Sequence, residues 1–480
     1  MTLQKKATKG LIWSFLERWG GQLISTSIFL VLASLLGPET LGLVALASVF
    51  IAFMTAFVNQ GFAPAIVQKE ELSDKHLNTA FWSSLSIGSV LFIATIASAG
   101  LIAQLFGEPD LKPVIRWLSV TFLFIALESV QVGLLQRGFA FKKLAIRSLL
   151  STAISGVVSL IMALLGFGVW SLVAQQLINR GVNVLVLWKA STWSPGRDVS
   201  FEHFKELSSF GVNVMGVNIL RFFNQRSDDF LIGYFLGTTA LGYYTVAYRL
   251  LRLMVNILTN TTVSVALPAF SRLQSKPAQL RNAFYKATQL TSFISFPAFT
   301  AVLLLAPQFV EVLFGENWSP SIPIMQVLVF AGILQSVSYF NGTVMLAKGK
   351  PSWRLFINFL NAILNVGGFI VAVRYGIVAV AIAVAVSGYI VMPVSLTLIR
   401  KLTDIKISQY FRQYLGPLAG SVTMGTVIAL IKQVIAGQLP PLAILIICST
   451  AGLVIYLGII TTVNRDLSKR VITLVKHAAR

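Results

Sequence analysis

The sequence predicts an all-α integral membrane protein, and three observations carry this prediction. The chain has 480 residues, of which 56% are apolar and only 11% are charged, whereas a soluble domain has about 25% charged residues. Its mean hydropathy is +0.78. Apolar runs of about 20 residues, the length that crosses the hydrocarbon of a bilayer as a helix, recur along the whole chain. These numbers exclude a protein whose entire surface faces water.

Fourteen apolar runs lie between charged or Gly/Pro-rich breaks, and we expect each to be one membrane-spanning helix. The runs are too long and too uniformly apolar for the strands of a membrane barrel, which alternate apolar and polar residues. The expected spans are 11–36, 41–63, 79–106, 113–135, 148–165, 169–189, 210–235, 241–265, 289–314, 320–346, 355–373, 377–399, 415–434 and 441–463.

The distribution of basic residues predicts the orientation, because lysine and arginine are retained on the cytoplasmic side of a membrane. If the N-terminus is cytoplasmic, 28 of the 38 basic residues lie in the eight inner segments between spans. Only four lie in the outer segments, and the other six lie inside the spans. Both termini are therefore expected to be cytoplasmic. The net charge of +21 is spread over these inner segments, so we expect no nucleic-acid partner.

Short motifs recur in the same order in the two halves of the chain. The segment Leu36–Gly42 shares Leu-Gly pairs with Leu236–Gly242, and Leu-Phe-Gly-Glu occurs at 105–108 and again at 313–316. Such a duplication of six spans predicts two pseudo-symmetric six-helix lobes with a substrate cleft between them. The expected division is an N-lobe at 1–200, a C-lobe at 201–403, and a last part at 404–480 with two extra helices and a basic cytoplasmic tail.

Six basic and five acidic residues fall inside the expected spans. A charge at the middle of a membrane costs about 2.5 to 3.5 kcal/mol on the insertion scale, so these side chains must face protein or water. Several follow one helical face together with amides, and the expected span 355–373 adds Asn358, Asn361 and Asn365. The residues expected to line a substrate cavity are Arg18, Gln22, Arg180, Asn218, Arg221, Gln225, Arg226, Tyr248, Arg249, Arg252 and Asn256.

Four carboxylates inside the spans, Glu17, Glu128, Asp228 and Asp229, are candidates for coupling transport to a proton or Na⁺. The alternative is that the intramembrane charges pair with one another inside the bundle and only stabilise helix packing. For example, Asp228 or Asp229 would then pair with Arg226 or Arg249.

The sequence offers few residues for catalysis or metal binding. Its one cysteine, Cys448, excludes an internal disulfide, and its histidines, His76, His203 and His477, are far apart in polar stretches. A phosphate-binding Walker motif is absent from the sequence. We therefore expect no metal site, no cofactor and no enzymatic activity.

Four motifs resemble one family of membrane transporters. They are Leu-Gly-Pro-Glu-Thr-Leu-Gly at 36–42, Arg-Ser-Asp-Asp-Phe-Leu-Ile-Gly at 226–233, the Tyr-rich segment 241–249, and Pro-Ala-Phe-Ser-Arg-Leu-Gln at 268–274. They resemble the lipid-linked oligosaccharide flippases of the Wzx type, which are polysaccharide exporters in the superfamily that also contains multidrug exporters.

The resemblance implies a carrier in the bacterial inner (plasma) membrane that works by alternating access. Such a carrier moves a polyprenyl-diphosphate-linked oligosaccharide to the outer face for exopolysaccharide, O-antigen or capsule export. Arginines suit the diphosphate because they stay charged and donate bidentate bonds. Membrane lipid is a further expected partner, and the resemblance leaves open coupling to H⁺ or Na⁺ and contact with the polysaccharide polymerase machinery.

Two other functions remain in view. A cation-coupled multidrug exporter has the same architecture, but it would favour an acidic, aromatic-lined cavity. A membrane polysaccharide polymerase or ligase would need a sizeable outer loop that carries its chemistry. The expected outer connections have only about 3 to 10 residues and contain no histidine, which disfavours an enzyme of this kind.

Overall fold

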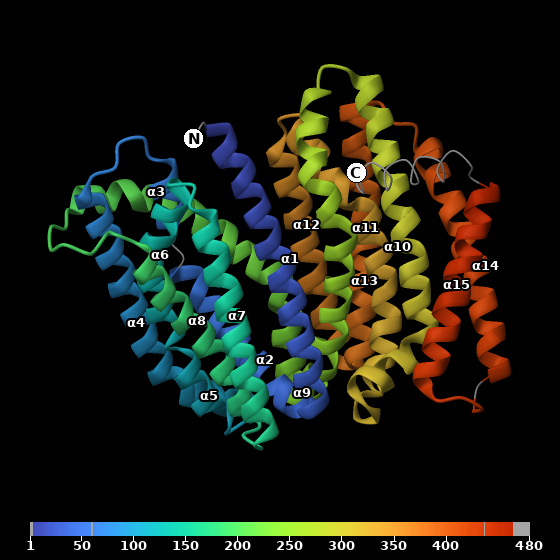
Figure 1. The fold of residues 1–480 in the computed structure, drawn as a ribbon, viewed down its shortest axis with the longest axis horizontal. Helices are drawn as coiled ribbons and strands as arrows, with labels where there is room; N and C mark the ends of the chain where they lie inside the picture. The colour runs from blue at the N-terminus through green and yellow to red at the C-terminus, as the bar shows by residue number, and fades with distance from the viewer. Residues whose placement is uncertain (1–2, 59–60, 436, 464–480) are drawn as a thin grey trace. The chain divides into compact units, whose positions relative to one another are not determined.

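The computed structural model describes residues 3–58, 61–435 and 437–463, and helices are the regular secondary structure of these residues (Figure 1). The predicted all-α class is thereby confirmed. The chain forms two compact units, Met1–Gly242 and Tyr243–Arg480. This division does not test the predicted lobe boundaries at 200 and 403, which stay a prediction.

The first unit contains eight helices and the beginning of a ninth in its described residues. Helix α7 packs against α1 and α8, while α6 packs against α3, α4 and α8. The long α9 begins in this unit and continues into the next. The helices are α1 (Leu3–Leu35), α2 (Pro38–Val58), α3 (Phe62–Gln68), α4 (Asp74–Phe106), α5 (Leu111–Leu118), α6 (Thr121–Arg137), α7 (Phe141–Leu164), α8 (Val169–Ala190) and α9 (Phe201–Arg272).

In the second unit, α10 packs against α11 and also carries the last two helices, α14 and α15, beside it (Figure 1). Helix α13 packs between α11 and α12. The elements are α10 (Pro277–Phe314), the 3₁₀ turn η1 (Glu316–Trp318), α11 (Ser321–Ala347), α12 (Pro351–Ala372), the 3₁₀ turn η2 (Val373–Tyr375), α13 (Ile377–Thr403), α14 (Ile407–Ile435) and α15 (Pro441–Val463).

Among the described residues, eleven helices are long and apolar enough to cross a membrane. Helices α1 and α8 fall outside this group. One of the eleven, Met215–Ile257, has 43 residues, about 64 Å of helix against a hydrocarbon thickness of about 30 Å. It covers two expected spans, and the backbone leaves helical geometry between them at Gly237. The total of fourteen spans stays a prediction.

The repeated Leu-Phe-Gly-Glu motif ends a long helix in each half of the chain. Gly107 terminates α4 with a φ of 66°, and Gly315 terminates α10 with a φ of 88°. Positive φ is sterically costly for other residues and easy for glycine. After Gly107, the Glu108 carboxylate accepts a hydrogen bond from the Thr238 hydroxyl at 2.8 Å. The two copies of this motif therefore share a local structure, the end of a long helix at a glycine, as well as an apolar composition.

The two repeated Leu-Gly turns meet in reciprocal backbone contact within the first unit. A Cβ atom on Gly42 would lie 1.7 Å from the carbonyl oxygen of Thr238, and one on Gly242 would lie 1.9 Å from that of Pro38. Both pairs of equivalent positions differ by 200 residues. Only glycine allows the two backbones to approach this closely, so the recurrence of glycine at both positions has a steric cause.

Apolar side chains fill the units and also cover much of their outer surface. Phe62, Ile66 and Phe81 belong to a buried cluster that α9 joins through Leu207. On α12, by contrast, large apolar residues such as Phe359 are half exposed. Exposed apolar surface on this scale is what a helix requires when its outer face contacts lipid.

Candidate functional site

Two of the predicted cavity arginines form ion pairs with predicted coupling carboxylates. In the first unit, Arg180 Nη1 donates to Glu128 Oε1 at 2.9 Å, which joins α8 to α6. Within α9, Arg226 Nη1 donates to Asp229 Oδ2 at 2.9 Å, one helical turn away. Asp228 is also buried, and its carboxylate accepts the backbone N–H of Asp229. The four paired side chains neutralise one another, and Asp228 binds the adjacent backbone N–H.

The Arg180–Glu128 pair gives a testable stability prediction. The Glu128 side chain is 13% exposed and that of Arg180 is 41% exposed. Removing the guanidinium in Arg180→Gln leaves a mostly buried carboxylate without its hydrogen-bond donor, and we expect a loss of roughly 1 to 2 kcal/mol after solvent screening. The double variant Glu128→Gln/Arg180→Gln should recover much of this loss in thermal melts of detergent-solubilised protein. A double variant as unstable as Arg180→Gln alone would contradict this account.

The remaining predicted cavity residues are distributed over both units. Gln22 donates to the Thr26 hydroxyl, and the Arg252 guanidinium lies 4.4 Å from the centre of the Tyr248 ring. Asn218 is half-buried, and so is Glu17, the remaining candidate for ion coupling. The exposed members of the set are Arg18, Arg221, Gln225, Arg249 and Asn256. Their convergence on one central chamber stays a prediction.

A polar cavity of about 510 Å³ lies inside the second unit. The end of α9 and helices α11, α12 and α13 form its walls. Its polar lining is made of amides, hydroxyls and one guanidinium, and no Asp or Glu lies among the described residues that line it. The polar lining residues are Asn256, Gln335, Ser338, Tyr339, Asn341, Thr343, Arg354, Asn358, Asn361 and Ser395.

Two buried polar atoms in this cavity are unsatisfied. The Asn341 side chain is 3% exposed, and its Nδ2 donates to the Ser395 hydroxyl at 3.0 Å. Its Oδ1 and the Ser338 hydroxyl have no hydrogen-bond partner among the described residues. An unsatisfied buried polar group costs about 1 to 3 kcal/mol. Both side chains therefore have unused hydrogen-bonding capacity beside the cavity that they line.

Arg354 provides the cavity's positive charge. It lies in the first turn of α12, where Pro351 begins the helix. Its side chain lies against α11 at Gly342, where a Cβ atom would be only 3.2 Å from Arg354 Nε. The absence of a side chain at Gly342 thus leaves room for the guanidinium. A guanidinium without a carboxylate beside it in the lining is suited to a phosphate or an acidic sugar, to which it donates paired hydrogen bonds.

Sequence patterns identified part of this cavity. Helical spacing predicts Asn256, Asn358 and Asn361, whereas Arg354 is one of the 28 basic residues in the expected inner segments, which indicate only the orientation. The polar residues of α11 were missed. Gln335, Ser338 and Asn341 recur every three residues, so the same helical-face criterion could have found them.

The structure also brings together polar residues that the sequence separates. The rings of His76 and His203 stack with centroids 3.8 Å apart, although we expected no histidine cluster. Their donor atoms and a carboxylate oxygen of Glu206 lie within 4.8 Å of one another. The pKa of the exposed Glu206 carboxyl lies below its ordinary value, chiefly because Lys69 donates a hydrogen bond to it. A hydrogen bond from His76 contributes less to this shift. Folding, which places α4 beside the start of α9, creates this cluster.

Comparisons with known proteins agree on the fold and the family. The "Succinoglycan biosynthesis transport protein ExoT" of Rhizobium meliloti (strain 1021) is 26% identical over 98% of this chain and 96% of its own length. The "Lipopolysaccharide biosynthesis protein WzxC" of Escherichia coli (strain K12) is 25% identical over 86% of this chain and 84% of its own.

Two solved structures share the fold. "Lipid II flippase MurJ, inward closed conformation" superposes with a TM-score of 0.78 at 16% identity, covering 95% of this chain and 99% of the other. A structure described as "Inward-facing conformation of a multidrug resistance MATE family transporter of the MOP superfamily" has a TM-score of 0.63 at 17% identity, covering 80% and 96%.

A family model described as "Polysaccharide biosynthesis protein" matches residues 31–323, which is more than half of the chain. The resemblance to polysaccharide exporters that the motifs indicate is confirmed by this match and by the relatives. The chain therefore belongs to this family of polysaccharide biosynthesis proteins.

Proposed function

We propose that this protein is a flippase for a polyprenyl-diphosphate-linked oligosaccharide. The observation that carries the proposal is the polar cavity of the second unit, where the described lining residues include one arginine, several amides and no carboxylate. A diphosphate sugar offers both chemical features that such a lining recognises. Its phosphate oxygens accept hydrogen bonds from Arg354, and its hydroxyls pair with the Asn341 and Ser338 side chains.

The predicted orientation places this cavity near the cytoplasmic end of the membrane. Arg354 lies four residues after Lys350 in the expected inner segment 347–354, which also contains Lys348. These charges raise the local concentration of an anionic head group, because fields from several like charges add. The head group enters here from the cytoplasm while its prenyl tail stays in the bilayer.

The transport cycle is alternating access between two lobes in the bacterial inner membrane, with both chain termini in the cytoplasm. Rocking of lobe 1–200 against lobe 201–403 exposes the head group to the outer face. A diphosphate diester carries about two negative charges, so an inside-negative potential of 100 mV favours its export by roughly 4.6 kcal/mol. Coupling to H⁺ or Na⁺ through the intramembrane carboxylates is the alternative energy source.

A gene deletion tests the proposed function. Cells without the protein should lose the surface polysaccharide and accumulate its lipid-linked precursor on the cytoplasmic leaflet, and the wild-type gene should restore both. The precursor is measured by extraction of membrane lipids, and its leaflet by accessibility to a lectin in oriented vesicles. An unchanged polysaccharide together with altered sensitivity to cationic dyes would refute the flippase and support a multidrug exporter.

A further inference from the structure

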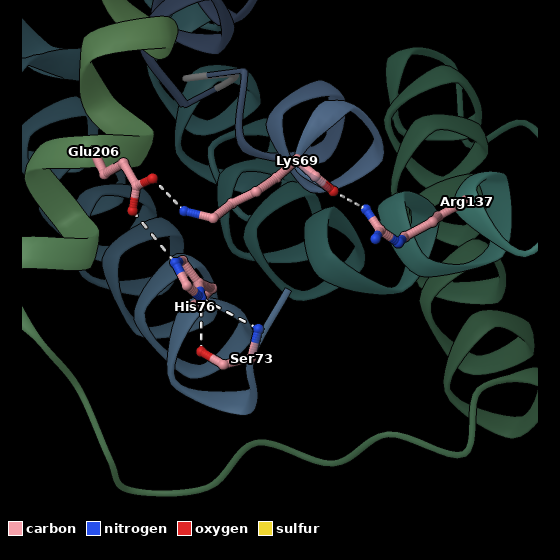
Figure 2. Close-up of polar contacts among 5 residues, drawn as sticks. All are labelled: Lys69, Ser73, His76, Arg137 and Glu206. Carbon is pink, nitrogen blue, oxygen red and sulfur yellow. Dashed lines mark hydrogen bonds and ion pairs between the residues drawn. The ribbon is translucent and has the colours of Figure 1, made fainter. Parts of the chain in front are cut away.

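The start of α9 is fastened to the turn between α3 and α4 by a group of polar contacts (Figure 2). The Glu206 carboxylate forms an ion pair with Lys69 through Oε1, and its Oε2 lies 3.3 Å from His76 Nε2. One helical turn earlier, His203 stacks on the His76 ring with 10° between the ring planes. Two imidazoles and a carboxylate are thus gathered at one place.

The first of these imidazoles is held in position by its neighbours. Ser73 and His76 form a capping box at the start of α4, in which His76 Nδ1 lies 2.6 Å from Ser73 Oγ and 3.2 Å from the Ser73 backbone nitrogen. This contact turns the opposite ring nitrogen, Nε2, toward Glu206 (Figure 2). Without a metal, Nδ1 accepts the Ser73 backbone N–H. Binding of a metal through Nε2 moves the ring proton to Nδ1, which then donates to Ser73 Oγ and orients the ring as in other histidine metal sites.

The turn that carries Lys69 is also braced. The Arg137 guanidinium donates to the backbone carbonyls of Ile66, Lys69 and Glu70. These bonds satisfy carbonyls at the end of α3 and tie that end to α6 (Figure 2). The wall beside Glu206 is therefore set by the fold of the first unit before any ion binds.

The donor atoms have the chemistry of a zinc site, and one pair of them already has the spacing. Zinc bonds of about 2.0 to 2.1 Å in a tetrahedron place donor atoms about 3.3 Å apart, and His76 Nε2 and Glu206 Oε2 already lie 3.3 Å apart. His203 Nδ1 is buried without a hydrogen-bond partner among the described residues. Binding through His203 requires its half-buried ring to rotate out of the stack on His76.

We propose that His76, His203 and Glu206 bind a divalent transition-metal ion of the zinc class, which fastens the start of α9 to the α3–α4 turn. The fourth ligand is water, since the Glu206 side chain is 54% exposed. Lys69 takes the place of the ion when none is bound, because its ammonium neutralises the same carboxylate. Metal binding displaces this ammonium into solvent along its flexible side chain.

Titration of the purified, chelator-stripped protein with Zn²⁺ tests the site by isothermal calorimetry and by metal analysis after dialysis. We expect one bound Zn²⁺ per chain and a Zn²⁺-dependent rise in melting temperature. His203→Ala and Glu206→Gln should each weaken binding at least tenfold. Lys69→Gln should bind Zn²⁺ more tightly than the wild type, because the competing cation is gone.

Matched variants keep this test specific. Glu202→Gln removes an exposed carboxylate one turn away on the same helix, and His477→Ala removes a histidine outside the described residues. Both should bind Zn²⁺ like the wild type, and size-exclusion profiles verify that each variant is folded. The proposal is overturned if no stoichiometric binding occurs, or if His203→Ala and Glu206→Gln bind as the wild type does. It is also overturned if Lys69→Gln destabilises the chain without changing its affinity for Zn²⁺.

Discussion

Gly42→Ala should be among the most destabilising small substitutions in this protein, with Gly242→Ala close to it. The added methyl groups would lie 1.7 Å and 1.9 Å from the backbone carbonyl oxygens of Thr238 and Pro38. A neighbouring side chain could rotate away from an added methyl group, but these neighbours are backbone atoms. The starts of two helices must therefore move apart. Overpacking a buried site costs typically about 1 to 3 kcal/mol, and we expect the upper end of this range for each variant.

Gly37→Ala is the matched control for both substitutions. Gly37 belongs to the same repeated turn, yet a Cβ atom there meets nothing within 4 Å. Melting of the detergent-solubilised protein, followed by tryptophan fluorescence, should show a marked drop for Gly42→Ala and Gly242→Ala and little change for Gly37→Ala. Equal melting temperatures for all three variants would show that the repeated turns are not in contact.

Arg354→Gln should lower export of the lipid-linked oligosaccharide about tenfold or more while leaving the amount of protein in the membrane unchanged. Hydrogen bonds to a charged group contribute about 1.5 to 3 kcal/mol, and Arg354 supplies the cavity's charge. Arg354→Lys should give an intermediate rate, because it keeps the charge but loses the paired hydrogen bonds. Export is measured as surface polysaccharide in complemented deletion cells and as precursor flux in proteoliposomes.

Arg374→Gln is the control for this prediction. Arg374 is an exposed arginine in η2, after the far end of the same helix, and it is not part of the cavity lining. It should export at the wild-type rate. Wild-type export by Arg354→Gln, at equal protein level, would remove the cavity from the transport path even if the chain remained a flippase by the deletion test.

Asn341 and Ser338 show why cavities are hard to predict from a sequence. Their spacing along α11 marks a polar face, but the same spacing also occurs where hydroxyls bond to their own helix, as the Ser336 hydroxyl does with the Gly332 carbonyl. Whether a polar side chain serves its helix or a ligand depends on what the neighbouring helices place opposite it. For Asn341 the neighbour is Ser395 on α13, which satisfies only one side of the amide.

Local features of the chain were determined by the sequence alone. Apolar runs of sufficient length must form helices in a bilayer, because a backbone without water satisfies its hydrogen bonds internally. The repeated glycines at 107 and 315 end helices for a reason that needs no tertiary contact, namely their freedom to adopt positive φ. Composition and these local preferences together determine the all-α membrane class.

Only the tertiary structure decided which polar groups meet. The ion pair of Arg180 with Glu128 spans 52 residues, and the contact of His76 with Glu206 spans 130. Helical periodicity orders residues along one helix but says nothing about the rotation and depth of its neighbours. Those depend on packing, where side-chain volumes and close glycine contacts such as Gly42 with Thr238 select one arrangement. The cavity around Arg354 exists for the same reason, since residues from four helices must converge to form it.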